Sequence, residues 1–594
     1  MPATAPGKVA PGSMPASSAT TTTLAPTVPP PPRLADSVTI PDPALPPRIS
    51  YHLPRWEAAL RRHPDQSLVR YHLHGLRFGY RHGNDKRPDL RVDAILPNLA
   101  SAFEHQDKIS ANIAAELAAG RYLGPFSSLA DIPSEFRPFR NAPLGIVPKK
   151  HTDPPKFRSI QHFSFPEGAS VNDGIDPDDF RIRYDGIHFL LALLVRLGPS
   201  AIFWKADVTD AFRTMPIHRS DWAMQGVFHL GRFYLDMYLP FGLRSAPFIF
   251  VSLMDLFNWI CVEDHRLVNL GHYVDDFIYA ASPELAAWSF AEFKSAADLY
   301  GVPFKASKYV EPTPTIEYVG FLVDDPSMSV SLPPDKRDRI RRLLAAWIGV
   351  PPAAPPVRSH HEAQSLLGHL MHVVQVLPDG KIFCDRLIAL IHSWASPFAG
   401  RRHVSSALRA DLSWWHDILD GWSGRRVLPI LDWEEDLRFF TDASGSVGAG
   451  GFLGDLWWCL RWSSALISGA CRGYDIFWEE MFAVWVSLVI WGPSFRGRRV
   501  VLHCDNQACV ASLASGRASR HPRVNELIRR IVLLRLELGF ELKVVYVPSE
   551  DNPADSLSRF VDLPSPSLQE PIPGPVVSLY GFAIASSPPS IVVS

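Results

Sequence analysis

Two adjacent carboxylates occupy the middle of the segment GHYVDDFIYA, residues 271–280. Asp275 and Asp276 lie between apolar and aromatic residues of the kind that favour a strand. Two unit charges about 4 Å apart repel by roughly 4 kcal/mol at an effective dielectric constant near 20. The pair therefore either points into water at a hairpin turn or is balanced by a bound cation.

A third carboxylate, Asp207, ends an apolar stretch that predicts a strand over 201–208. Carboxylates that converge from two strands can hold two divalent cations, one to activate a hydroxyl and one to neutralise a leaving pyrophosphate. Mg²⁺ suits such a site because it takes few carboxylates and leaves room for substrate phosphates. Mn²⁺ is a second candidate. We therefore predict that Asp207, Asp275 and Asp276 form a metal site for nucleotidyl transfer.

A second set of acids lies at the ends of predicted elements in the C-terminal part of the chain. These acids are Asp442, Glu480, Asp505 and Asp555. Together they can form one metal cluster that hydrolyses a phosphodiester through a metal-activated water. For any single member, a helix cap or an exposed turn is the simpler interpretation, but that is a poor account of all four.

The elements that must position these acids follow from periodicity and breakers. Short helices are predicted over 51–120 and mostly helices over 331–430, where Ser359 and Glu362 have capping-box spacing. From residue 437 the predicted order is strand, strand, helix, strand, helix, strand, which indicates a separate α/β unit. Further predictions are helices over 187–198, 282–301 and 336–349 and a strand over 273–280.

Composition indicates several folded domains. The chain has 594 residues, 46% of them hydrophobic, and a net charge of −2, so nucleic-acid binding must rest on local basic patches. Six scattered cysteines without a CxxC pair favour a reducing, intracellular compartment, the cytoplasm or the nucleus, and argue against a zinc module. The chain contains no continuous apolar run of about 18 residues, so no transmembrane helix is expected.

The motifs, taken in order, resemble those of reverse transcriptases over roughly residues 121–325. YVDD resembles the YxDD box, and KADVTDAF resembles the first palm motif. LPFGLRSAPFIF lies where the family has its intervening motif, LGIVPKK and KFRSIQHF resemble the fingers, and IEYVGFLVD resembles the primer grip. The resemblance implies an α+β right-hand polymerase with fingers, palm and thumb, followed by a connection and an α/β RNase H-like domain.

The resemblance also implies roles for individual residues around the predicted metal site. Asp210 would shape the triphosphate site, Phe212 would collide with a ribose 2′-hydroxyl and so select dNTPs, and Gly242 would allow close backbone approach. Basic residues of the fingers would bind the triphosphate, and these are Lys149, Lys150 and Arg158. Core packing is the alternative for Phe212, and a solvated turn is the alternative for the two lysines. The later-palm lysine is either Lys305 or Lys308.

The C-terminal acids match the four catalytic acids of a retroelement RNase H domain over about 436–561. Many relatives have a mobile His just before the final Asp, but the loop here reads SEDNPAD and lacks it. A set of arginines either holds a hybrid backbone or forms a solvated face. This set is Arg496, Arg498, Arg499, Arg517, Arg520 and Arg523. The segment GHLMHVVQVLPDGKIF is similar to the connection of DIRS-like and related long-terminal-repeat elements.

The predicted domain boundaries follow from these motifs. They are a Pro/Ala/Ser/Thr-rich disordered segment over 1–50, an N-terminal helical region over 51–120, fingers and palm over 121–330, thumb and connection over 331–435, the RNase H-like domain over 436–562 and a disordered tail over 563–594.

The predicted function is that of a retrotransposon RNA-directed DNA polymerase that also hydrolyses RNA in RNA–DNA hybrids. Its partners would be an RNA template, a DNA primer, the hybrid and dNTPs, with no membrane partner. Two alternatives are an enzyme active only as an RNase H and a catalytically inactive nucleic-acid-binding remnant. The oligomeric state stays open.

Overall fold

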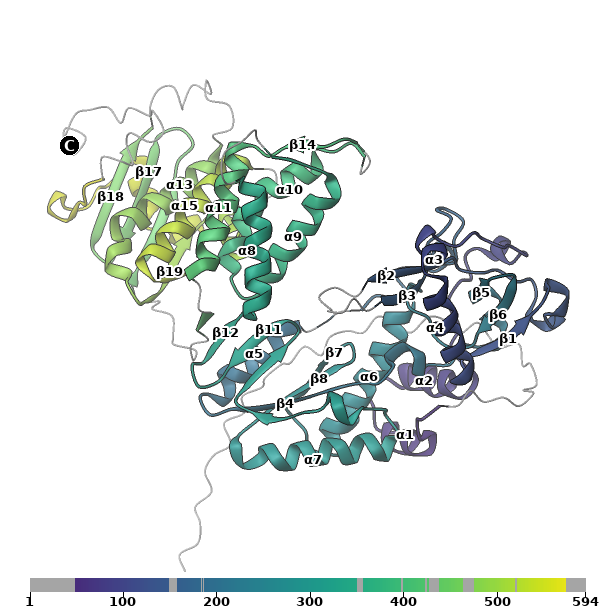
Figure 1. Ribbon diagram of the computed structural model, residues 1–594. Helices are drawn as coiled ribbons and strands as arrows, with labels where there is room; N and C mark the ends of the chain where they lie inside the picture. Colours follow the sequence, from purple (N-terminus) through teal and green to yellow (C-terminus); the bar gives the residue numbers. More distant parts are fainter. Residues whose placement is uncertain are drawn as a thin grey trace, which may run out of the picture. The chain divides into compact units, whose positions relative to one another are not determined.

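The protein combines helices with several separate sheets (Figure 1), which confirms the predicted α+β class. The computed structural model describes residues 49–148, 157–182, 184, 186–349, 356–396, 399–421, 425–426, 437–462, 475–518 and 521–572. The chain divides into two compact units. The first comprises Met1–Tyr184, Asp207–Val268 and Phe293–Ser307, and the second comprises Asp185–Ala206, Asn269–Glu292 and Lys308–Ser594.

The first unit contains a three-stranded antiparallel sheet of order β1-β6-β5 and an antiparallel β2-β3 hairpin. Its helices are α1 (Leu53–Leu60), α2 (Gln66–Phe78), α3 (Ala100–Glu104), α4 (Gln106–Ala118) and α6 (Ala246–Glu263). Its strands are β1 (Tyr122–Phe126), β2 (Leu144–Pro148), β3 (Phe157–Gln161), β5 (Gly226–His229) and β6 (Arg232–Asp236). Ile109 and Ile113 of α4 pack with Tyr122 of β1 in a buried cluster. The short helices predicted over 51–120 are confirmed.

A four-stranded sheet of order β7-β8-β4-β9 carries the paired carboxylates. Its strands are β4 (Ile202–Asp207), β7 (Leu270–Tyr273), β8 (Asp276–Ala281) and β9 (Val310–Thr313), and α5 (Gly186–Leu197) contacts β7 and β8. The predicted strand over 273–280 is wrong at its start. Tyr273 pairs with Asp276, so Val274 and Asp275 form a two-residue hairpin turn. The predictions for α5, β4 and the helix α7 (Pro283–Tyr300) are confirmed.

The segment after this sheet is mostly helical, as predicted. Its helices are α8 (Pro334–Ile348), α9 (His360–Val374), the 3₁₀ helix η8 (Pro378–Cys384), α10 (Asp385–His392) and α11 (Ser406–Gly421). Short strands accompany them: β10 (Thr315–Tyr318), β11 (Phe321–Asp324), β12 (Ser329–Ser331), β13 (Val357–Arg358), β14 (Arg402–His403) and β15 (Arg425–Arg426). Ser359 and Glu362 form the predicted capping box of α9.

The C-terminal part is an α/β domain around a five-stranded sheet of order β18-β17-β16-β19-β20. Its strands are β16 (Phe439–Ala443), β17 (Gly448–Leu453), β18 (Leu456–Arg461), β19 (Arg499–Cys504) and β20 (Glu541–Tyr546). Strands β16, β17 and β18 are antiparallel neighbours, whereas β16, β19 and β20 run parallel. Its helices are α13 (Ile476–Trp491), α14 (Gln507–Ser515), α15 (Pro522–Leu538) and α16 (Ala554–Arg559).

The predicted mixture of strands and helices from residue 437 is therefore confirmed, but the predicted element order is incomplete. The separateness of this part stays a prediction. A third strand, β18, follows β17, and two helices, α14 and α15, separate β19 from β20. Residues beyond the domain also contact it, since the indole nitrogen of Trp457 on β18 donates a 3.1 Å hydrogen bond to the carbonyl of Ser565. Residues 1–48 and 573–594 lie outside the described residues.

Two helices among the described residues are long and apolar enough to cross a membrane by length and composition alone. They are Ala246–Glu263, which is α6, and Ile476–Phe495, which includes α13. The expectation of no transmembrane helix stays a prediction, because length and composition alone do not separate a spanning helix from a core helix. In these helices 67% and 72% of the apolar window is buried inside the protein, as in a core helix. The absence of a membrane partner stays a prediction.

Candidate active site

The four acids predicted in the C-terminal domain line one pocket of about 470 Å³. They come from four different elements: Asp442 from β16, Glu480 from α13, Asp505 from the residue after β19, and Asp555 from α16. The remaining wall contains the apolar Ile476 and six small or polar residues, namely Ala443, Ser444, Gly445, Ser446, Asn506 and Arg559. The sequence separates these acids by up to 113 positions, and the fold brings them together.

Parallel strand pairing brings Asp442 and Asp505 to the same edge of the sheet. Strands β16 and β19 run parallel, with Thr441 opposite Cys504, so the next residue of each strand lies at the same end. Carboxyl ends of parallel strands commonly form the binding edge of α/β folds. The side chain of Asn506 then accepts hydrogen bonds from backbone N–H groups at the start of α14, which fixes the turn after Asp505.

A glycine on β17 allows the helix that carries Asp555 to approach the sheet. Gly450 pairs with Asp442, and a Cβ atom on Gly450 would lie only 2.5 Å from the Cβ of Leu557 on α16. Any larger residue would therefore push α16 away. The side-chain amide of Asn552 donates a 3.0 Å hydrogen bond to the carbonyl of Thr441, which ties the loop before α16 to β16. Asp555 is thereby held beside Asp442.

Glu480 enters the pocket from the most deeply buried helix of the domain. Asp475 caps α13 by accepting a 3.1 Å hydrogen bond from the backbone N–H of Trp478. Glu480 is 4% exposed and shares the buried surface of the helix with Ala483 and Val484, as the spacing predicts. Because α13 contacts β16 and β17, its buried carboxyl faces the acids of the sheet edge.

The pKa values of two acids show how unfavourable this gathering is without a counter-charge. Burial, followed by the charges of Asp505 and Asp555, raises the pKa of Asp442 to about 7. Burial raises the pKa of Glu480 to about 11, with smaller contributions from Cys504, Asp442 and Asp505. Desolvation and like charges both penalise an ionised carboxyl, and a bound cation relieves both penalties.

The donor set of the pocket fits Mg²⁺. The ion prefers oxygen ligands, and all four acids supply carboxylate oxygens. The Oδ1 atom of Asp505 is buried and has no hydrogen-bond partner among the described residues, although its Oδ2 atom accepts a 2.5 Å hydrogen bond from Ser549. Asp555 is oriented by Arg559, whose Nε atom lies 2.8 Å from its Oδ1 atom. A buried carboxylate oxygen without a partner is the position that a cation would complete.

The paired carboxylates of the earlier sheet lie at a strained hairpin. Val274 has a φ angle of +58°, a conformation that β-branched residues rarely adopt, and such outliers concentrate at functional sites. Asp276 begins β8, and the Nζ atom of Lys205 on the neighbouring strand β4 lies 3.8 Å from its Oδ2 atom. Asp207 ends β4 and belongs to the first unit, whereas Asp275 and Asp276 belong to the second. The three-carboxylate metal site therefore stays a prediction.

Three of the predicted nucleotide-binding residues lie close together in the first unit. The ring of Phe212 packs against Phe241, with 5.1 Å between centroids, and the guanidinium of Arg158 lies 5.9 Å from the centroid of the Phe241 ring. Gly242 follows with a φ of +97°, and a Cβ atom there would lie 2.7 Å from the carbonyl oxygen of Gln161. Its close approach in the structure is thus to β3. Lys149 and Lys150 lie outside the described residues.

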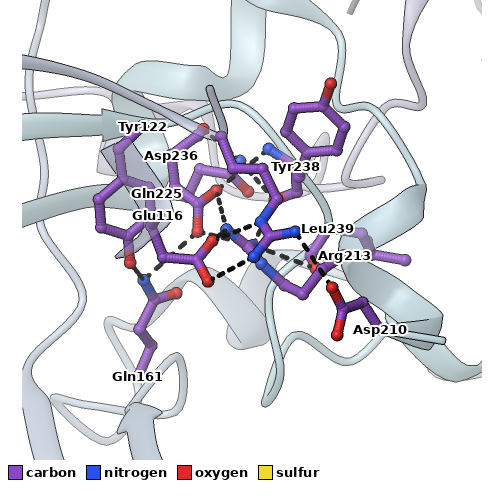
Figure 2. A network of polar contacts seen from close by, with 10 residues as sticks. Glu116, Tyr122, Gln161, Asp210, Arg213, Gln225, Asp236, Tyr238 and Leu239 are labelled. Atoms are coloured by element: carbon purple, nitrogen blue, oxygen red, sulfur yellow. Dashed lines mark hydrogen bonds and ion pairs between the residues drawn. The ribbon is translucent and has the colours of Figure 1, made fainter. Parts of the chain in front are cut away.

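A buried network of charges anchors the segment that contains Asp210 and Phe212 (Figure 2). Arg213 donates hydrogen bonds to both carboxylate oxygens of Asp236 at 2.9 and 3.0 Å and to Glu116 at 2.7 Å. Arg121 binds Glu116 through two hydrogen bonds and lies 3.3 Å from Asp210. The network therefore connects α4 and β6 to the 3₁₀ turn η5 (Ala211–Thr214), and its outermost acid is Asp210.

The pKa values show that the two arginines compensate the buried acids unequally. Burial alone would raise the pKa of Glu116, but Arg121 and Arg213 together lower it. Burial raises the pKa of Asp236, and Arg213 only partly offsets the effect. Asp236 is 1% exposed, so Arg213 is the group that makes its charge tolerable.

Several residues around the C-terminal pocket were not found from the sequence. Ser549 and Asn552 act through partners 44 and 111 positions away, and no local pattern marks them. Glu479 is 4% exposed, and burial raises its pKa to about 7, yet it stands beside the predicted Glu480 without any motif of its own.

Arg517 was a candidate for hybrid binding, but its Nε atom lies 2.8 Å from Asp385 of α10.

Comparisons with known proteins give likenesses only among solved structures. No protein-family model and no curated protein matches the chain. One similar structure is the foamy viral protease-reverse transcriptase in complex with RNA/DNA hybrid, with a TM-score of 0.45, 14% identity and coverage of 80% of this chain and 56% of that chain. Another is the same kind of protein, named dRH, in complex with double-stranded DNA, with a TM-score of 0.44, 14% identity and coverage of 79% and 73%.

The chain thus spans just over half the length of the first of these proteins. A third structure, the foamy viral protease-reverse transcriptase in complex with double-stranded DNA, has a TM-score of 0.42 and 16% identity over 77% of this chain and 85% of that chain. These three structures are all foamy viral protease-reverse transcriptases. They do not test the predicted DIRS-like subfamily.

Proposed function

We propose that the chain is an RNA-directed DNA polymerase of a retroelement that also hydrolyses the RNA strand of RNA–DNA hybrids. The gathering of Asp442, Glu480, Asp505 and Asp555 in one pocket carries the proposal. Burial and mutual repulsion make such a cluster unfavourable by itself, as the raised pKa values of Asp442 and Glu480 indicate. A helix cap or an exposed turn explains none of these raised values.

The chemistry proposed for this pocket is phosphodiester hydrolysis. The four acids would hold Mg²⁺, or Mn²⁺ in its place, and the bound ion would supply a water activated for attack on phosphorus. Ser444 and Ser446 line the pocket between β16 and β17 and offer hydroxyl donors to a sugar–phosphate backbone. Asn506, which follows the parallel strand β19 at the same end of the sheet, offers an amide. Contacts of this kind are independent of base sequence, as cleavage of a hybrid requires.

The polymerase half of the proposal rests on the hairpin and the first unit. Asp207, Asp275 and Asp276 would hold the ions for nucleotidyl transfer, since β4 and β8 are neighbouring strands. The remaining proposed nucleotide contacts are Lys149, Lys150, Arg158, Asp210, Phe212 and Gly242. The forked guanidinium donors of Arg158 suit a triphosphate. The ring of Phe212 packs against the ring of Phe241, which is 44% exposed.

The proposed partners are an RNA template, a DNA primer, the hybrid that forms from them and dNTPs. The competing proposals are an enzyme that only cleaves hybrids and an inactive nucleic-acid-binding remnant.

The test is cleavage of a hybrid whose RNA strand carries an end label, with the full chain and Mg²⁺. We expect cleavage by the wild type and loss of cleavage in Asp442→Asn. The matched control is Asp455→Asn, because Asp455 is an exposed acid in the turn between β17 and β18 and should not affect cleavage. A folded wild-type protein that binds the hybrid without cutting it would overturn the hydrolase proposal and favour the remnant.

A further inference from the structure

A buried thiol lies beside two acids of the C-terminal pocket. Cys504 ends β19, is fully buried, and its Sγ atom lies 3.9 Å from the Oε2 atom of Glu480. Glu480, Cys504 and Asp505 each offer one ligand atom, and these three atoms all lie within 4.8 Å of one another. A mixed set of one sulfur and two oxygens differs from the all-oxygen set that suits Mg²⁺.

The spacing of these atoms matches a single softer ion. With Zn–S near 2.3 Å and Zn–O near 2.1 Å, a tetrahedral ion holds its sulfur and oxygen ligands roughly 3.6 Å apart. The observed separation of Cys504 and Glu480 is 3.9 Å. Independently, the buried Oδ1 atom of Asp505 has no hydrogen-bond partner among the described residues. Both Glu480 and Asp505 line the pocket, so an ion from solvent can reach them.

We propose that a thiophilic divalent cation, Zn²⁺ or Cd²⁺, binds Cys504 together with Glu480 and Asp505. A metal–sulfur bond replaces the S–H bond, and the thiol proton passes to the buffer. Mg²⁺ does not use this sulfur, because it is a hard ion that takes oxygen ligands. The consequence for activity rests on the proposed function, since Glu480 and Asp505 would then be withdrawn from the Mg²⁺ site and hybrid cleavage would be inhibited.

The binding test uses Cd²⁺ alone, added to the full chain without nucleic acid. Thiolate coordination produces an ultraviolet charge-transfer band, which reports the bond without any need for activity. We expect one equivalent of this absorbance to disappear in Cys504→Ser. Cys459→Ser is the matched control, because Cys459 is equally buried on β18 of the same sheet and lies outside the cluster, so its loss should leave that equivalent unchanged.

A second variant protects the test against a misfolded Cys504→Ser protein. Glu480→Gln keeps the thiol but removes a carboxylate ligand, so we expect it to weaken Cd²⁺ binding by at least roughly tenfold while circular dichroism stays unchanged. Absorbance that is the same in the wild type, Cys504→Ser and Glu480→Gln would overturn the proposal.

The inhibition test measures hybrid cleavage at fixed Mg²⁺ with increasing Cd²⁺, each variant being compared with its own activity without Cd²⁺. The half-inhibitory concentration should rise at least roughly tenfold in Cys504→Ser and stay unchanged in Cys459→Ser. Equal sensitivity of both variants contradicts the role of Cys504. If no variant and no wild type cleaves the hybrid, the proposed function fails, whereas the absorbance measurement still decides the binding of Cd²⁺.

Discussion

Replacing Asp442 with asparagine should stabilise the C-terminal α/β domain at neutral and alkaline pH when no divalent cation is present. Asp442 is 3% exposed, and burial beside Asp505 and Asp555 raises its pKa from the usual 3.8 to about 7. In the unfolded chain this carboxyl ionises above about pH 4, whereas in the folded domain it ionises only above about pH 7. Raising the pH between these values therefore favours the unfolded state. Asparagine has no charge and escapes this difference.

The magnitude follows from the size of the shift. A group whose pKa is raised by folding contributes its full stability below the unfolded value and loses it as the pH rises through the folded value. A shift of about three pKa units corresponds to about 4 kcal/mol at 1.36 kcal/mol per unit. The stability of Asp442→Asn relative to the wild type should therefore increase by about 4 kcal/mol between pH 4 and pH 8.

Hydrogen exchange of the backbone amides of β16 and β17, followed by mass spectrometry, measures the opening free energy of this domain alone. Intrinsic exchange rates are corrected for pH, and Asp455→Asn serves as the exposed control. Mg²⁺ should reduce the difference if the proposed metal site is correct, because it would bind the ionised wild-type pocket. A difference between Asp442→Asn and the wild type that is independent of pH, or that decreases as pH rises, would refute this account of the pocket.

Three further predictions concern the first unit. Gly242→Ala should destabilise this unit by about 1–3 kcal/mol, because the φ of +97° and the contact with the carbonyl of Gln161 both exclude a side chain. The thermal midpoint should therefore fall, and an unchanged midpoint would contradict this reasoning. Arg213→Met should cost about 3–5 kcal/mol in urea unfolding, because it leaves the buried Asp236 without its guanidinium partner while Glu116 keeps Arg121. The control Arg62→Met, which removes a 67% exposed partner, should cost less than about 1 kcal/mol, and equal costs would contradict the argument. Phe212→Ala should allow primer extension with rNTPs, and continued rejection of rNTPs would assign this ring to core packing.

Local sequence patterns were sufficient to predict the helices and to identify the acids of the C-terminal pocket. The apolar spacing of α8 predicts that Ile340, Leu343, Leu344 and Trp347 share one face. Three of them are buried, and Leu343 is half-buried. The capping box of α9 is a signal four residues long, from Ser359 to Glu362, and the structure contains it. Glu480 could be assigned to a buried face from its neighbours because a helix repeats every 3.6 residues.

Features that depend on distant partners could not be predicted from the sequence. Propensity assigns Val274 to a strand, but the pairing of Tyr273 with Asp276 forces it into a turn with positive φ. The role of Gly450 depends on α16, whose Leu557 lies 107 positions later. The buried pairing of Arg213 with Asp236 likewise joins two segments that carry no shared motif. Each of these was decided by tertiary packing.

The central claim is that one chain carries two activities at two separate sets of acids. One reaction tests it: a labelled DNA primer on a differently labelled RNA template, with Mg²⁺ and dNTPs, so that primer extension and RNA cleavage are read together. We predict that Asp276→Asn abolishes extension and still cleaves a preformed hybrid, whereas Asp442→Asn extends the primer and leaves the RNA intact. Loss of both extension and cleavage in either folded variant would contradict the account, and so would retention of both.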